Sequence, residues 1–293
     1  PYIYSGKDDV MDHFFDYITT EYYDNIEPIL MMNESMAPLT KEQQVAHDAA
    51  PRCQCCNFHF TVNNKKTAHH CHITSEYIAP ICNNCNLQLK NKKTSTAKGK
   101  VEYFLPIFFH NLKGYDGHLL IKHMSKKFTR SKINVVAESS EKFIYFQVAA
   151  FRFLDSMQFL NASLDTLASN LREEGLDKFA HTAQHFKVAD MPLVTAKGVF
   201  PYEYMDSMER LAETELPPKR KFFSTLNDSH ISEEDYERAQ RVWQHFDMKT
   251  MKDYHDLYMK CDVLLLAYIF KTFRNLSLSI YGLDPAHYYT SPG

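Results

Sequence analysis

The sequence lacks a long apolar run and a leader segment. None of its uninterrupted apolar stretches approaches the roughly 18 residues that a membrane span needs. The chain also does not open with a charged and then apolar segment that ends in a small-residue cleavage site. Internal repeats and low-complexity tracts are missing as well. These absences argue against a membrane protein, a secreted protein and a repeat array, so we expect an intracellular globular protein.

The composition is sufficient for a sizeable core. Hydrophobic residues make up 44% of the 293 residues and aromatic residues 14%, which fits one large domain or two smaller ones. Seven cysteines are present. In an intracellular protein, cysteines that fall in C-x-x-C pairs usually bind a metal rather than form disulfides.

Charge is distributed unevenly along the chain, although the net charge is only −3. Residues 1–50 carry 2 Lys/Arg against 10 Asp/Glu, a net charge of −8. Residues 51–100 carry 8 against 1 (+7), and residues 101–293 carry 23 against 25 (−2). Basic charge concentrated in a cysteine-bearing segment attracts phosphate. The pattern therefore favours nucleic acid as a partner, with a solvated basic face as the alternative.

The chain divides into three parts. Residues 1–50 combine apolar and acidic spacing and predict a helical lead-in. Prolines before the cysteines, and a polar linker over residues 91–100 after them, set off residues 51–100 as a small unit. Residues 101–293 form the larger remainder. Because the chain opens at Pro1 without an initiator Met, we expect it to be a segment of a longer protein.

The larger part has the sequence pattern of an α/β domain. β-Branched and aromatic runs predict strands over residues 104–110, 133–137, 143–148 and 151–155. Apolar spacing and a capping signal predict helices over residues 118–124, 164–171, 232–245 and 254–278. Residues 175–230 are rich in loops. A mixture of strands and helices in this order predicts a sheet covered by helices.

Two cysteine pairs predict a zinc site. Cys53 and Cys56 form one C-x-x-C pair, and Cys82 and Cys85 form a second pair about 25 residues later. Two such turns present four thiolates to one Zn²⁺ in a tetrahedral arrangement. We expect Cys55 and Cys71 to be free thiols.

The histidines between the cysteine pairs carry a resemblance of their own. The segment Ala68-His69-His70-Cys71-His72, with Asn86 after the last zinc cysteine, resembles the endonuclease VII branch of the His-Asn-His (HNH) nucleases over about 40 residues. The resemblance implies a small ββα zinc module, with His70 as general base and with His72 and Asn86 as further motif residues. His69 stands where the family has a metal-binding Asp. Since imidazole is a poor ligand for Mg²⁺, we expect this module to contact DNA without cutting it.

Three residues outside the module suggest metal-dependent hydrolysis. Asp116 follows a predicted buried strand and precedes a helix, the usual location of a ligand site in α/β sheets. Tyr258 and Asp262 are spaced i and i+4 on the last helix, so both lie on one face. Two-metal hydrolysis needs carboxylates for the cations and a group that aligns the attacking water.

Together these segments resemble the second and third exonuclease motifs of protein-primed family B DNA polymerases. The resemblance spans residues 101–293, and Polinton/Maverick and adintovirus polymerases are the most similar. It rests on the segment from Phe109 to Asp116, the Y-x-x-x-D pair, and the blocks at 198–206, 216–218 and 283–292. It implies a ribonuclease-H-like mixed sheet with flanking helices, the fold of 3′→5′ proofreading exonucleases. It also implies DNA replication as the process and a terminal priming protein as a partner.

The resemblance assigns a role to each matching residue. Asp116 and Asp262 would bind Mg²⁺ or Mn²⁺, and Tyr258 would orient the attacking water. A single-stranded 3′ end would be held by His110, Asn111, Tyr115 and Ser156. Ser163 fits the family's strand-contacting motif as well as Ser156 does, so the two stay open.

One motif of that family is missing from the sequence. No predicted strand carries its first motif, Asp-x-Glu, and Asp235-Tyr-Glu237 has those letters only in the first turn of a capped helix. We expect the missing motif upstream of Pro1 and this fragment to be inactive alone. The alternatives are an HNH-like zinc nuclease or DNA-binding module, and a domesticated mobile-element remnant. By resemblance the protein would be nuclear or associated with a virus or mobile element.

Overall fold

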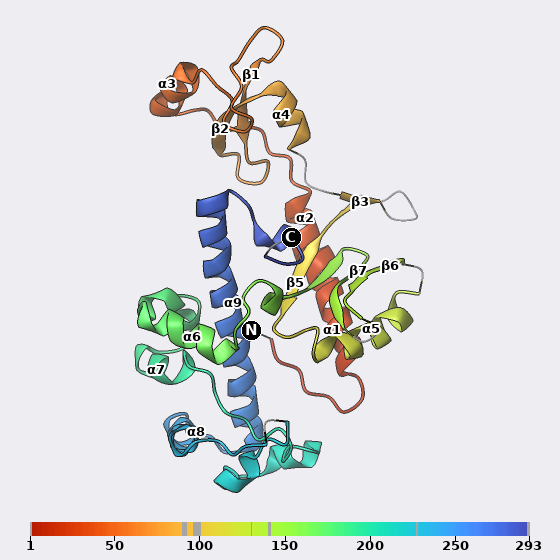
Figure 1. Ribbon diagram of the computed structural model, residues 1–293, viewed down its shortest axis with the longest axis vertical. Helices are drawn as coiled ribbons and strands as arrows, with labels where there is room; N and C mark the ends of the chain where they lie inside the picture. The colour runs from red at the N-terminus through yellow and green to blue at the C-terminus, as the bar shows by residue number, and fades with distance from the viewer. Residues whose placement is uncertain are drawn as a thin grey trace.

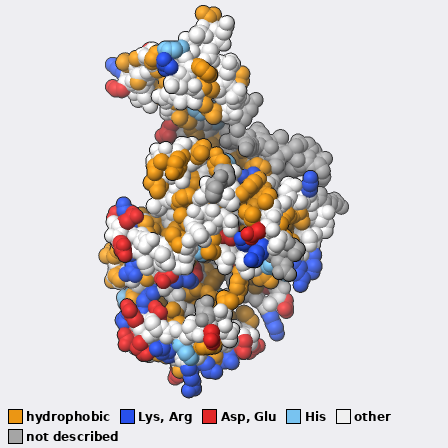
Figure 2. Space-filling model, in the orientation of Figure 1, with side chains coloured by type: hydrophobic (Ala, Val, Ile, Leu, Met, Phe, Trp, Pro, Cys, Tyr) orange, Lys and Arg blue, Asp and Glu red, His pale blue; other side chains and the backbone are white. Residues whose placement is uncertain are grey.

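The structure is a computed structural model that describes residues 2–89, 93–95, 101–129, 131–139, 142–226 and 228–291. It has a small lobe and a larger body (Figure 1). Most of the polar linker predicted over residues 91–100 lies outside the described residues. Figure 2 shows that the small lobe stands apart at one end of the molecule.

A mixed sheet organises the body. Its four strands are β5 (Leu105–Phe109), β8 (Phe151–Asp155), β7 (Phe143–Val148) and β6 (Ile133–Ala137), in the order β5-β8-β7-β6. β5 pairs with β8 in parallel, while β7 is antiparallel to both of its neighbours. The predicted strands over 133–137, 143–148 and 151–155 are confirmed. β8 is buried along its whole length, including the charged residues Arg152 and Asp155.

The helices of the lead-in cover this sheet. α1 (Val10–Thr20) continues into a π-helical segment (Glu21–Ile26) and α2 (Glu27–Leu30). Phe15, Ile18 and Tyr22 are buried in one cluster with Phe146, Phe151 and Phe153 of the sheet and with α5 (Asp116–Lys127). Burial of apolar surface at this interface stabilises the body, at about 25 cal/mol for each Å² removed from water.

A second layer forms around the longest helix. α9 (Met251–Tyr281) packs against α6 (Leu164–Glu173) and α7 (Met191–Val194) in one cluster. Its N-terminal end packs against α8 (Glu233–His245) in another. Thr250 forms a capping box with Asp253 and therefore starts α9 three residues before the predicted position. Short 3₁₀ helices occupy the predicted loop-rich region over residues 175–230, at Leu176–Phe179, Thr182–Gln184, Val188–Asp190, Met208–Ala212 and Lys219–Phe222. Two more described 3₁₀ segments lie outside this region, at Ser156–Gln158 and Pro285–His287.

α9 is the one helix in the described chain that is long and apolar enough to cross a membrane by length and composition. Buried core helices pass the same test, and Tyr258, Cys261 and Leu265 of α9 are buried within the body. Its C-terminal turns expose Leu276, Ile280 and Tyr281. Figure 2 shows hydrophobic side chains gathered at this end of the body, beneath the small lobe.

The small lobe holds the four cysteines that were predicted to bind zinc, and it has the predicted ββα order. β1 (Lys66–His70) and β2 (Tyr77–Cys82) pair antiparallel and lead directly into α4 (Asn83–Gln88). α3 (Lys41–Ala49) belongs to this lobe, because Lys66 donates to the carbonyls of His47 and Asp48 at its last turn. A two-stranded sheet of β3 (Lys93–Ser95) and β4 (Val101–Tyr103) joins the lobe to the body.

Candidate active site

The four predicted zinc ligands lie together in the small lobe. Their Sγ atoms are all within 4.8 Å of one another. Cys53 and Cys56 come from the turn before β1, while Cys82 ends β2 and caps α4. This is a donor set that suits zinc in composition and number. Cys55 and Cys71 are not part of the group.

The backbone around these cysteines favours the thiolate form at one of them. Burial alone would raise the pKa of the Cys53 thiol, but backbone N–H groups that donate to its Sγ lower the pKa to about 6. One of these donors is the N–H of Cys82, at 3.1 Å. The pKa of Cys85 is raised, chiefly by its hydrogen bond with Cys82. Metal binding requires all four thiols to lose their protons, and the backbone donors at Cys53 favour that change at this ligand.

The residues of the HNH-like motif form two separate contacts. His69 Nδ1 lies within hydrogen-bond distance of Asn86 Oδ1, at 3.1 Å, and this contact links β1 to α4. The rings of His70 and His72 lie 4.6 Å apart, and His70 Nε2 contacts the carbonyl of Glu34 at 3.3 Å. Asn86 is thus engaged by the residue that replaces the motif's metal-binding carboxylate.

In the body, a lysine joins the predicted pair on α9. The ammonium of Lys197 contacts both the hydroxyl of Tyr258 and Oδ2 of Asp262. Tyr202 completes the group, because its hydroxyl lies 2.5 Å from that of Tyr258. The other carboxylate oxygen of Asp262, Oδ1, is buried without a hydrogen-bond partner. A buried anionic oxygen with no donor is a suitable ligand for a cation.

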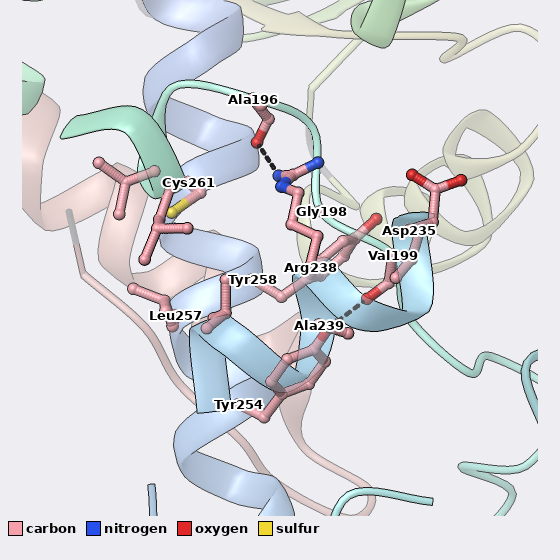
Figure 3. A pocket seen from close by; sticks show the side chains of 13 residues that line it. Ala196, Gly198, Val199, Asp235, Arg238, Ala239, Tyr254, Leu257, Tyr258 and Cys261 are labelled. Atoms are coloured by element: carbon pink, nitrogen blue, oxygen red, sulfur yellow. Dashed lines mark hydrogen bonds between the residues drawn. The ribbon is translucent and has the colours of Figure 1, made fainter. Parts of the chain in front are cut away.

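The loop that carries Lys197 lies tightly against α9. A Cβ atom at Gly198 would come within 3.0 Å of the Tyr258 ring, so glycine permits this close approach. Figure 3 shows Gly198, Arg238, Tyr254 and Tyr258 around a small cavity of about 30 Å³, which is room for about one water molecule.

The ends of β5 and β8 hold the other predicted residues. Asp155, at the end of β8, is fully buried and accepts hydrogen bonds from the N–H groups of Asn111 and Lys113 at 2.9 and 3.0 Å. It therefore shapes the loop between β5 and α5. Asp116 is the first residue of α5, which begins two residues before the predicted helix, and Tyr115 before it is 69% exposed.

Two predicted DNA-binding residues have internal partners. Ser156 is completely buried; its hydroxyl donates to the carbonyl of Phe109 and contacts His110 Nδ1, each at 2.9 Å. Its side chain has no exposed surface in this conformation. Ser163 is the N-cap of α6 and accepts from the N–H of Thr166. Both hydroxyls are thus used within the fold.

Burial perturbs the titration of this region. It raises the pKa of Asp262, and the nearby Lys197 opposes that rise. It also raises the pKa of Asp116, where the charge of Asp155 acts in the same direction. Burial lowers the pKa of His110, whose Nε2 has no hydrogen-bond partner. Perturbed carboxylates near unpartnered polar atoms are typical of functional sites.

Sequence reasoning missed Lys197, Tyr202 and the role of Asp155. Lys197 and Tyr202 come from the loop-rich region, more than 50 residues before Tyr258. The one local signal was Gly198, which stands in the conspicuous block at 198–206. For Asp155, the sequence shows only its place at the end of a predicted strand.

Comparison with known proteins agrees with this division of the chain. The family model for organellar and viral type B DNA polymerase matches residues 105–293. A search of curated proteins and a search of solved structures gave no match. The matched range begins at β5 and includes every predicted residue of the body site, while the zinc lobe lies outside it. Since the match covers more than half of the chain, this protein belongs to the organellar and viral type B DNA polymerases.

Proposed function

We propose that the body contributes a metal-dependent 3′→5′ proofreading exonuclease site to a protein-primed DNA polymerase. The observation that carries the proposal is the group of Tyr258, Asp262 and Lys197, in which Asp262 Oδ1 is buried and unpartnered. The mixed sheet with flanking helices suits a ribonuclease-H-like domain. The family supplies the context of DNA replication.

Each residue has a task that its surroundings support. Asp262 and Asp116 would hold Mg²⁺ or Mn²⁺, which in such sites activates water and offsets charge on the phosphate. Burial raises the pKa of Tyr258, so its phenol stays protonated and can donate or accept one hydrogen bond toward a water. The Lys197 side chain contacts both Tyr258 and Asp262. Tyr115, highly exposed at the mouth of the loop, is available for stacking on a base.

Further carboxylates are needed for two cations. In the described sheet β5 is an edge strand, so its outer side can pair with one more strand. We propose that a strand with the Asp-x-Glu motif pairs there and brings its carboxylates next to Asp116. Without it, we expect the present chain to degrade DNA poorly.

The test is degradation of single-stranded 3′ ends in Mg²⁺ or Mn²⁺ by the polymerase that contains this chain. Asp262→Ala should abolish degradation, and circular dichroism should show that the variant is still folded. Asp256→Ala is the matched control, because Asp256 lies on the same helix and pairs with Lys252 at 2.6 Å. Degradation that survives Asp262→Ala would place the chemistry elsewhere.

For the zinc lobe we propose a second, non-catalytic function in binding DNA. The segment 51–100 has a net charge of +7, and the position of the motif carboxylate is held by His69, bonded to Asn86. Magnesium-dependent cleavage of branched DNA that His70→Ala abolishes would contradict this proposal.

A further inference from the structure

An arginine on α8 holds the loop that carries Lys197. Arg238 Nη2 donates to the carbonyl of Ala196 at 2.8 Å, and Nη1 donates to the carbonyl of Lys197 itself. Figure 3 shows the guanidinium beneath this loop. Because a guanidinium presents its donors in one rigid plane, two bonds to successive carbonyls fix the orientation of both peptide groups.

This arginine has no acidic partner to explain its position. Among the described residues no carboxylate forms an ion pair with Arg238, and its buried Nε has no hydrogen-bond partner. Burial accordingly lowers its pKa. A cation withdrawn from water destabilises a fold unless hydrogen bonds compensate for the lost hydration. The two loop carbonyls provide that compensation.

A second anchor holds the other end of the same loop. The hydroxyl of Tyr254, on α9, donates to the carbonyl of Val199 at 2.7 Å, and Figure 3 shows this bond beside Ala239 of α8. Gly198 lies between the anchors and against the Tyr258 ring. The Lys197 side chain therefore projects from a loop whose backbone is anchored on both sides, and its ammonium contacts Tyr258 and Asp262.

We propose that Arg238 is a positioning residue, which places the Lys197 ammonium against Tyr258 and Asp262 by holding the carbonyls of residues 196 and 197. Its importance for catalysis rests on the proposed exonuclease function, but the coupling of the two side chains does not. A guanidinium that only filled space would act independently of the lysine side chain.

A double-mutant cycle on unfolding separates these two roles without DNA or metal. The equilibrium constant for urea unfolding is measured for the wild-type chain, Lys197→Met, Arg238→Met and the double variant. Each single substitution should increase the unfolding constant by some factor. We expect the unfolding constant of the double variant to be about threefold to tenfold smaller than the product of these two factors predicts, as is usual for interacting residues. The matched control is Arg241→Met, since Arg241 lies one turn further along α8 and is exposed beside Glu237. Arg241→Met should combine with Lys197→Met additively.

Two further variants keep the test decisive. If Arg238→Met does not fold, Arg238→Lys replaces it. Lysine keeps the positive charge but lacks the planar pair of donors that binds both carbonyls. Arg238→Lys should therefore show a smaller coupling to Lys197→Met, of the same sign. Tyr254→Phe should couple to Lys197→Met as well, since it frees the other end of the loop. Additive effects of Arg238 and Lys197 in a folded double variant would overturn the proposal, whether or not the polymerase degrades 3′ ends.

Discussion

Asp116 and Asp262 differ in what compensates their negative charge. Asp262 contacts the Lys197 ammonium, whereas the charge of Asp155 raises the pKa of Asp116 further than burial does alone. For an acid whose pKa is higher in the folded state, the folded state binds more protons between the unfolded and folded pKa values. Stability therefore falls as the pH rises through this window.

The first prediction concerns Asp116→Asn. Removing a carboxylate whose pKa is raised by burial and by the charge of Asp155 should raise the melting temperature at pH 7 by roughly 2–4 °C in the absence of metal. The gain should shrink as the pH falls toward 3.8, the ordinary pKa of the carboxyl. Calorimetry across pH checks this, with Asp256→Asn as the control, because Asp256 pairs with Lys252. Saturating Mn²⁺ should reverse the order, because only the wild-type residue is a good ligand. An Asn variant less stable than the wild type at pH 7 without metal would contradict the role of burial.

At the scale of elements, strands β6, β7 and β8 and the start of α9 show why the sequence predicts some element boundaries and not others. Strands β6, β7 and β8 follow their aromatic and β-branched runs, so the sequence locates them well. α9 begins at Met251, because Thr250 and Asp253 cap each other across the first turn. The apolar spacing gives no sign of that start. Lys197 could not be assigned at all, since its contacts depend on a loop held by two distant helices.

The second prediction concerns this cap. Thr250→Ala should lower the free energy of unfolding by about 1 kcal/mol, because the N–H of Asp253 loses its side-chain acceptor. Chemical denaturation measures the change. Ser279→Ala is the control, since Ser279 lies inside the same helix and bonds the carbonyl of Leu276; it should change stability by less than about 0.5 kcal/mol. Equal effects would mean that the cap is unimportant.

The third prediction concerns the metal of the small lobe. Purified protein should contain about one zinc per chain, and chelation should unfold the lobe while the body stays folded. Elemental analysis and hydrogen exchange measure the two effects. Cys82→Ser should lose the metal, whereas Cys55→Ser should keep it, because Cys55 is exposed and outside the four-sulfur group. Full zinc content in Cys82→Ser would rule out this ligand set.

At the scale of the whole molecule, charge follows the fold only in part. The acidic residues 1–50 supply α1 and α2, which cover the sheet, and the described lobe carries the basic residues Arg52, Lys65 and Lys66. The sequence could show this distribution of charge because it depends on composition alone. It could not show that α3 belongs with the lobe, since that depends on the bond from Lys66 to the carbonyl of His47.

The fourth prediction is that the lobe binds DNA through phosphate contacts. Affinity for duplex DNA should fall steeply with salt. Exchanging the exposed Arg52 and Lys65 for Glu should weaken binding and reduce the slope of log K against log salt by about one to two. Exchanging Lys249 and Lys252, which lie at the far end of the body, alters net charge equally and is the control. Fluorescence anisotropy measures both. Equal losses would point to a general effect of charge.

The hydrogen bonds between Tyr22 and Tyr103 have a consequence for how this polymerase could have acquired its extra lobe. The Tyr22 hydroxyl donates to the carbonyl of Tyr103 at 2.8 Å and accepts from its N–H at 3.1 Å. Residues 81 positions apart are thereby neighbours, so the chain departs from the body and returns at almost the same point. Domains with such close ends can be inserted or removed with little disturbance of their host. A chain in which a short Gly/Ser bridge replaces residues 33–99 should therefore keep the cooperative unfolding of the body, and an ancestor without the lobe could have gained it in a single insertion.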